Sequence, residues 1–181
     1  LIMETTRGNR EPTPGFTREE ELDRLVEAIH KTLERKGSVL IPAFALGRTQ
    51  EILAQLALLM QEGKLKKQPV FIGGLGRVFT EIYDNQAKRT YRNHPDLRLT
   101  RDLNLVVLDK KQADSMKLTG GRIFVITAGM LSENTGSHEL AARMMEDERH
   151  GIFFVGYTDP ETPGGRLRES KIGEPFHYSD G

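Results

Sequence analysis

The sequence predicts an α/β fold: a Rossmann-like, mainly parallel sheet with helices on both faces. Short apolar runs alternate along the chain with amphipathic runs of helical spacing, which is the pattern of βαβ units with right-handed crossovers. The apolar run at 38–43 (SVLIPA) has no polar alternation, which is typical of a strand covered on both faces. With 181 residues, 37% of them hydrophobic, the chain is expected to form a single domain, 1–181.

The first predicted helix carries the clearest local signals. Thr17 and Glu20 match a capping box, in which a hydroxyl and a carboxylate bond free amide groups at a helix start. The apolar residues that follow recur at helical spacing and predict one buried face: Leu22, Leu25, Val26, Ile29 and Leu33. Gly37 is expected to end this helix. Upstream, residues 1–3 are expected to end a buried strand.

The later elements follow the same alternation. A second helix is expected between Gly47 and Gly63, because apolar residues gather on one side of that segment. Strands are expected at 38–43, 69–72, 103–108, 122–127 and 152–155, and helices after Gly76, near 112–117 and around 138–145. Residues 86–102 follow no regular pattern, and residues 156–181 are expected to form an irregular tail.

Composition excludes several classes of protein. The 26 Lys and Arg residues balance 26 Asp and Glu residues, so the chain is no basic nucleic-acid coat, although a neutral domain can still present a basic groove. No apolar stretch approaches the roughly 20 residues of a membrane helix, and no signal-peptide pattern opens the chain. The absence of Cys excludes disulfides, thiolate zinc sites and cysteine nucleophiles, and it fits a cytoplasmic location.

Glycine and polar residues gather where the predicted strands end. Five such segments occur, at 4–6, 45–48, 73–77, 128–132 and 156–159. The carboxyl ends of parallel strands share one edge of the sheet, where ligands meet loops and helix N-termini. Glycine before a helix lets a phosphate approach exposed N–H groups, although each glycine alone could serve only to turn the chain. The accumulation of five such ends points to a phosphate-rich ligand.

Two charged residues at these strand ends are candidates for a functional role. Glu4 follows an apolar strand end directly, where a carboxylate is partly desolvated and needs a partner. It could equally bond the amides of the neighbouring loop or pair with a nearby Arg. Arg48 opens a predicted helix, where a cation is poorly placed for the helix dipole, so either an anionic ligand or a surface ion pair would explain it.

Metal and dinucleotide signatures are weak. The five histidines, His30, His94, His138, His150 and His177, include no pair at ligand spacing, so no metal site is expected in this chain. The segment 74–76 begins like a G-x-G-x-x-G fingerprint, but Phe79 stands where the last Gly is required.

Read in order, the strand-end segments resemble the motifs of one family. Residues 1–10 (LIMETTRGNR) are similar to the first β-CASP motif, an acidic residue in an L-I-x-E-[ST]-T-x-G setting. Residues 41–51 (IPAFALGRTQE) match that family's P-x-F-A-x-G-R-x-Q-E segment and are the most specific element. Residues 129–132 (GMLS) resemble its G-M-L turn, and Gly156-Tyr157 its last strand. The chain is therefore similar to a β-CASP domain along nearly its whole length.

The resemblance implies a part in RNA hydrolysis. β-CASP proteins join this domain to a metallo-β-lactamase core in the same polypeptide, and RNA lies between the two while two zinc ions in the core activate water. The first-motif carboxylate, here Glu4, is implied to be catalytic by orienting a histidine that protonates the leaving oxygen. Phosphate and sugar contacts are expected from Gly47, Arg48, Gly129 and Ser132, since such contacts use Arg, hydroxyls and helix N-termini.

Two departures limit this expectation. Arg7 stands where many members have Tyr, which puts aromatic stacking there in doubt. The zinc-binding H-x-H-x-D-H motif is absent, so the chain is expected to be a fragment of a longer protein, to hold no zinc and to cut no RNA alone.

Two further hypotheses stay open. The chain could be a free-standing Rossmann-like domain that binds a nucleotide or nucleotide-sugar at the turn 73–77. It could instead serve as an interaction surface, with residues 86–102 as the contact and a homodimer of the parent protein as one outcome.

Overall fold

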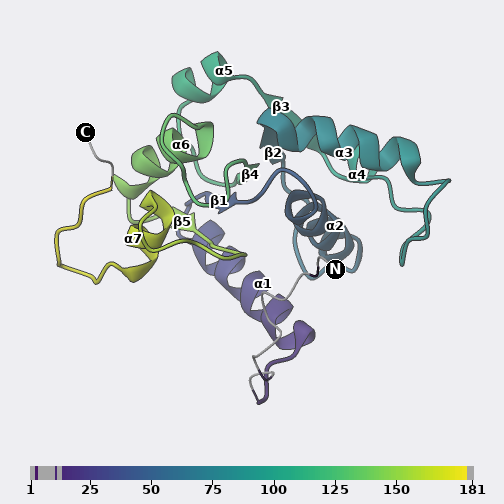
Figure 1. Ribbon diagram of the computed structural model, residues 1–181, viewed down its shortest axis with the longest axis horizontal. Coiled ribbons are helices and arrows are strands. Elements are labelled where there is room, and N and C mark those ends of the chain that lie inside the picture. The colour runs from purple at the N-terminus through teal and green to yellow at the C-terminus, as the bar shows by residue number, and fades with distance from the viewer. Residues whose placement is uncertain (1–2, 4–10, 12–13, 179–181) are drawn as a thin grey trace.

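The computed structural model, which describes Met3, Glu11 and residues 14–178, confirms the α/β fold (Figure 1). All pairings in the five-stranded sheet are parallel, in the order β3-β2-β4-β1-β5. The strands are β1 (Val39–Pro42), β2 (Val70–Gly73), β3 (Leu105–Leu108), β4 (Ile123–Ile126) and β5 (Gly151–Ile152). The expected strand at residues 1–3 lies almost entirely outside the described residues.

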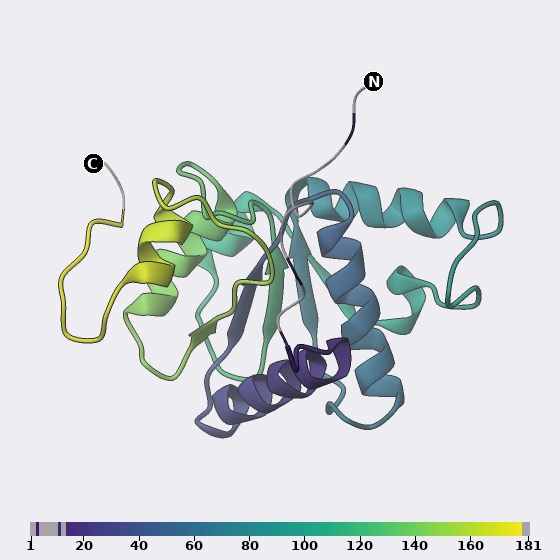
Figure 2. The ribbon, with the colours of Figure 1, turned by 60° about the horizontal axis from the view of Figure 1, so that its bottom comes forward.

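Helices alternate with the strands and cover both faces of the sheet. They are α1 (Arg18–Glu34), α2 (Arg48–Gln61), α3 (Gly74–Gln86), α4 (Leu99–Asp102), α5 (Lys110–Ser115), α6 (Gly136–Met145) and α7 (Pro163–Glu169). Figure 2 shows α2 on one side of the strands and α6 with α7 on the other. Within the described residues, no helix combines the length and apolar character that crossing a bilayer demands.

Each face of the sheet has its own buried core because successive strand residues point to opposite faces. On one face, Val39, Ile41 and neighbouring-strand residues in register with them pack against α1 and α2. On the other face, Leu40, Phe71 and Phe124 pack against α6, and the two phenylalanine ring centroids lie 4.9 Å apart. This two-sided burial explains why the strands lack polar alternation in sequence.

The first helix begins as predicted but ends differently. The capping box is present: the Thr17 hydroxyl accepts from Glu20 N–H, and the Glu20 carboxylate accepts from Thr17 N–H. The left-handed residue after the helix is Lys36, with φ 62°, not Gly37. Lys36 N–H donates to Leu33 O, and Gly37 N–H donates to Thr32 O, as in a Schellman turn. Gly37 is required instead for a close approach, because a Cβ there would lie 1.6 Å from Arg149 O.

The other differences between the expected and the observed elements lie in segments where the sequence pattern spans only a few residues. Helix α7 falls in the segment expected to be an irregular tail, and its start carries a Thr162 cap followed by Pro163 at the first turn. Helix α4 falls in the 86–102 segment. Strand β5 is shorter than expected, although Phe153 N–H still donates to Leu40 O.

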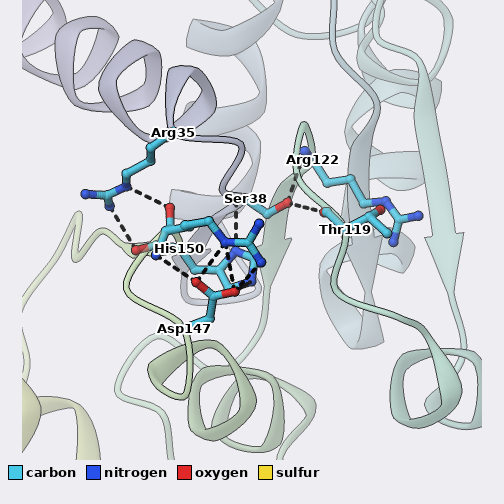
Figure 3. Close-up of polar contacts among 7 residues, drawn as sticks. Arg35, Ser38, Thr119, Arg122, Asp147 and His150 are labelled. Atoms are coloured by element: carbon cyan, nitrogen blue, oxygen red, sulfur yellow. Dashed lines mark hydrogen bonds and ion pairs between the residues drawn. The ribbon is translucent and has the colours of Figure 1, made fainter.

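The amino ends of the central strands are held together by a buried polar cluster around Ser38 and His150 (Figure 3). Ser38 is fully buried; its hydroxyl donates to Thr119 O over 2.8 Å and accepts from Arg122 N–H over 3.2 Å. The Arg35 guanidinium donates to Arg149 O and His150 O. These bonds join the turns that precede β1, β4 and β5, and they satisfy backbone groups that burial would otherwise leave unpaired.

His150 serves this cluster as a neutral acceptor. Its side chain is 3% exposed, and Nδ1 accepts the Ser38 N–H over 2.9 Å. Burial lowers the pKa of the His150 imidazole, against the opposing effect of the Asp147 carboxylate, whose Oδ2 lies 4.0 Å from Nε2. Arg149 holds the pKa of the Asp147 carboxyl well below its usual range, so this carboxylate stays ionised.

We predict that His150 makes the fold sensitive to mild acid. The unfolded chain binds a proton at His150 near pH 6.5, whereas the folded chain resists protonation, so stability is full above this pH and is lost as pH falls through the folded-state pKa. In urea unfolding between pH 8 and pH 5, the wild type should lose more free energy of unfolding than His150→Asn, whose amide oxygen can accept from Ser38 without titrating. Parallel pH profiles for the two proteins would contradict this role.

Candidate functional site

The candidate site lies at the carboxyl ends of the strands, the upper edge in Figure 2, where α2 and α3 begin. Strand β4 lies between β1 and β2 in the sheet. The chain leaves β1 and β2 toward α2 and α3, which pack together, but leaves β4 toward α6 on the opposite face. Neighbouring strands whose connections diverge to opposite faces leave a crevice between their loops, the usual ligand position in open α/β sheets.

A cavity of about 720 Å³ occupies this crevice. Its walls are mainly apolar and include the side chains of Phe44, Leu75 and Leu140. The full lining is Phe44, Ala45, Gly73, Gly74, Leu75, Leu108, Asp109, Ala113, Ile126, Thr127, Ala128, Asn134, Thr135, Gly136, Glu139 and Leu140. Four of the five strands therefore contribute their carboxyl ends or following loops to one cavity.

The segments that follow β1, β2 and β4 pack closely against one another around Gly76. A Cβ at Gly76 would lie 3.2 Å from Thr49 Cγ2 and 3.3 Å from Thr127 Cγ2. Thr49 is fully buried, and its hydroxyl donates to Phe44 O over 2.8 Å. The first turn of α3 therefore lies between Thr49, at the start of α2, and Thr127, which follows β4.

Gln50 ties the same loops by hydrogen bonds. Its side chain is 3% exposed, and Oε1 accepts the Gly47 N–H over 2.8 Å. Its Nε2 lies 3.1 Å from both Ala45 O and Thr80 Oγ1, while the Thr80 hydroxyl donates to Gly76 O over 2.8 Å. One buried amide thus holds the loop after β1 and the first turns of α2 and α3 in a fixed relation.

Ser137 has the corresponding role in the loop after β4. It is fully buried; its Oγ accepts the Ala128 N–H and donates to Ala128 O, each over 2.8 Å. The neighbouring Thr135 hydroxyl donates to Ser132 O over 2.5 Å and accepts from His138 N–H. The turn from Ala128 to Thr135 is therefore fastened to the start of α6.

Gly47 and Arg48, both expected to contact substrate, lie at the start of α2. Gly47 is the N-cap residue, with φ 83°, and open space surrounds the position of a Cβ. Arg48 is 40% exposed and donates from Nη1 to Glu51 Oε2 over 2.6 Å. Arg18 also donates to Glu51, over 3.1 Å, so two guanidinium groups share one carboxylate and leave the trio with a net positive charge.

Gly129 and Ser132, the other two expected contacts, lie in the turn after β4. Gly129 packs against the loop after β1, since a Cβ there would lie 3.0 Å from Phe44 N. Ser132 is exposed. The structure thus places Gly129 against the loop that leads to Gly47 and Arg48. Glu4, the expected catalytic residue, lies outside the described residues.

Sequence reasoning missed the buried polar residues that hold this site, chiefly Gln50 and Ser137. A signal for Gln50 was present: it shares a helical stripe with Leu53 and Ala57, which are buried, and a polar residue on such a stripe needs hydrogen-bond partners. Ser137 sits in the first turn of a short helix and gives no comparable periodic signal.

The described residues do not offer a metal site. Among them, no group of three or more His, Cys, Asp or Glu side chains could hold a metal ion. Of the carboxylates at the cavity, Asp109 accepts from Gln112 N–H as the N-cap of α5. His138 stacks on the Tyr178 ring with centroids 4.5 Å apart, and burial raises the pKa of the Tyr178 phenol.

Comparison with known proteins identifies this arrangement. The Beta-Casp domain model matches residues 49–167, which include most of the loops just described. The chain is 31% identical over 183 residues to the transcription termination factor FttA of Lokiarchaeum sp., covering 92% of this chain and 27% of that protein.

Two other relatives are similar to the same extent. RNase aCSPSF2 of Saccharolobus solfataricus is 30% identical over 182 residues, covering 99% of this chain and 34% of that protein. Cleavage and polyadenylation specificity factor subunit 3 of Dictyostelium discoideum is 30% identical over 167 residues, covering 87% and 20%. The chain thus spans about a third or less of the length of these relatives.

We predict that Gln50→Leu destabilises the fold by about 1–3 kcal/mol, because it leaves the part-buried Gly47 N–H and Ala45 O without their side-chain partner. The matched control is Gln55→Leu, which makes the same change on the same helix at a half-buried residue. Urea unfolding measures both variants. Equal stability of the two variants would mean that the buried amide does not hold the loops.

Proposed function

The chain belongs to the β-CASP family, and we propose that it is the substrate-clamping domain of a zinc-dependent RNA hydrolase. In this role it binds RNA at the carboxyl edge of its sheet and positions it for phosphodiester cleavage in RNA processing or decay. The names of two relatives, an RNase and a cleavage and polyadenylation specificity factor subunit, support this proposal.

The observation that carries the proposal is the convergence of loops from four strands on one cavity at the point where β1 and β4 diverge. Helix α3 borders this cavity and begins at Gly74, and its N-cap residue, Gly73, provides no side-chain hydrogen bond. A helix N-terminus without a cap presents N–H groups and the positive end of the helix dipole, which suit a phosphate. The apolar walls of the cavity suit a base or a ribose.

We assign substrate contacts to Gly47, Arg48, Gly129 and Ser132. Arg48 supplies the guanidinium, and its ion pair with Glu51 is partly exposed, so a phosphate can compete for it. Ser132 is exposed and supplies a hydroxyl. Glu4 is assigned, from the family motif alone, to orient a histidine that is provided outside this chain.

The chain itself is not proposed to hold the zinc. The described residues contain no suitable ligand cluster, so they do not fit the two ions that the family resemblance implies. The proposal therefore places both ions in a metallo-β-lactamase core of the same polypeptide, and no catalytic step is assigned to metal on this chain. It follows that the chain alone should not cleave RNA.

The other sequence-based hypotheses carry less support. Gly73 and Gly74 do line the cavity, but the family membership favours an RNA-facing domain over a free-standing nucleotide-binding one. We propose a cytoplasmic location, in keeping with the absence of Cys. Homodimerisation of the parent protein is kept as a separate expectation.

We predict that Arg48→Gln in the complete polypeptide weakens binding of single-stranded RNA several-fold. It should also reduce the slope of log affinity against log salt by about 0.7, the value for one phosphate neutralised on a single strand. The matched control is Arg18→Gln, which removes the other guanidinium from Glu51. Fluorescence anisotropy at several salt concentrations, with metal chelated so that RNA stays intact, measures both. An unchanged affinity and slope for Arg48→Gln would contradict its assignment.

A further inference from the structure

A second, smaller pocket lies between the start of α2 and the segment that follows α3. Its volume is about 360 Å³. Its lining includes Gly47, Glu51, Tyr83, Tyr91, Asn93 and His94. The segment 88–94 is part of the stretch for which the sequence predicts no regular structure, and it projects from the end of α3 at the right of Figure 2.

Tyr91 is the most distinctive side chain of this pocket. Its side chain is 94% exposed, which leaves nearly all of an aromatic ring in water. Single-stranded nucleic acids bind proteins through such rings, because every base has a face that stacks on them. Tyr83, on the other wall, is already covered: the Arg92 guanidinium lies 5.9 Å from its ring centroid and donates a hydrogen bond to its carbonyl oxygen.

The charges around Tyr91 favour a polyanion. Lys88 and Arg89 are exposed and make no ion pair with any described residue. The carboxylate that lines the pocket, Glu51, is already bonded to Arg18 and Arg48. Exposed amide and imidazole groups at Asn93 and His94 add donors and acceptors of the kind that read unpaired base edges.

The segment is anchored at its far end although it is irregular. The Asp84 carboxylate accepts from Leu99 N–H over 3.0 Å, and from Thr100 N–H and the Thr100 hydroxyl over 2.8 and 2.7 Å. Leu99 is buried in the core beneath α2. Because α3 and α4 are tied in this way, Tyr91 is presented from a loop with a fixed base, which lowers the entropy cost of binding.

This pocket continues the candidate site. Ala45 lines the main cavity, and Gly47, two residues later, lines the second pocket. Helix α3 runs from Gly74 at the cavity to Tyr83 at the pocket, a rise of about 14 Å at the usual rise per residue. An RNA strand that occupies the cavity could therefore pass over the starts of α2 and α3 and reach Tyr91.

We propose that residues 88–94 form a second RNA subsite, in which one unpaired base stacks on Tyr91 and Lys88 and Arg89 bind the flanking phosphates. The proposal rests on the proposed function, since it extends the same RNA strand beyond the main cavity. It gives the irregular segment a role in binding single-stranded RNA beside the main cavity.

The test compares RNA binding by variants of the complete polypeptide with metal chelated. The probes are a short fluorescein-labelled oligouridylate and the same strand with abasic riboses. Tyr91→Ala should weaken oligouridylate binding roughly 5- to 150-fold, the range for removing the aromatic partner of one stacked base, and leave binding of the abasic strand unchanged. Tyr91→Phe, which keeps the ring, should bind as the wild type does.

A second pair of variants tests the charges. Lys88→Gln with Arg89→Gln should lower the salt slope by about 0.7 for each phosphate that is no longer neutralised. The control pair, Lys66→Gln with Lys67→Gln, removes the same charge from two exposed residues that precede β2. They lie near the amino ends of the strands, away from the cavity, so the slope should stay unchanged.

The outcomes separate this subsite from the proposed function. If the wild type binds RNA and Tyr91→Ala binds it equally well, the subsite is wrong and the function stands. If the wild type binds no RNA, both are wrong. If Tyr91→Ala leaves RNA affinity unchanged but converts a dimer into a monomer in light scattering, the segment is a protein contact and the subsite is overturned.

Discussion

The site depends on one packing constraint, the contact of the loops after β1, β2 and β4 around Gly76. A side chain at this position would press on the Thr49 and Thr127 methyl groups, which lie 3.2 and 3.3 Å from the position of a Cβ, and Gln50 bonds the loop backbones on one side of it. The cavity and the starts of α2 and α3 keep their relative positions because Thr49 and Gln50, which make these contacts, are buried. A site that must hold a flexible polymer gains from such a fixed frame, since the ordering cost is met in folding rather than in binding.

The amino ends and the carboxyl ends of the strands differ in what surrounds them. At the amino ends of the strands, Ser38, His150 and Arg35 bond backbone groups of the turns that precede β1, β4 and β5. At the carboxyl ends, the divergence of β1 and β4 opens a cavity of about 720 Å³. The proposed RNA path follows the open edge and continues along α3.

The fold could be predicted from sequence because its signals are local. Apolar runs without alternation mark the buried strands, and Thr17 with Glu20 marks the start of α1. Helix α7 and the close approach of Gly37 to Arg149 could not be predicted, since the helix is short and the contact joins residues that are remote in sequence. The position of the site at the carboxyl edge followed from the strand-end residues. Its buried bonds, such as those of Ser137 to Ala128, could not be predicted, because they form only when separate segments meet.

The most direct test of the central claim is photo-crosslinking of thiouridine-substituted RNA to the complete polypeptide, with crosslinked peptides identified by mass spectrometry. If RNA binds at the carboxyl edge of the sheet, crosslinks should fall within residues 43–50, 73–78 and 127–137. Crosslinks confined to the amino edge, within residues 35–38, 119–122 and 147–151, would contradict that claim.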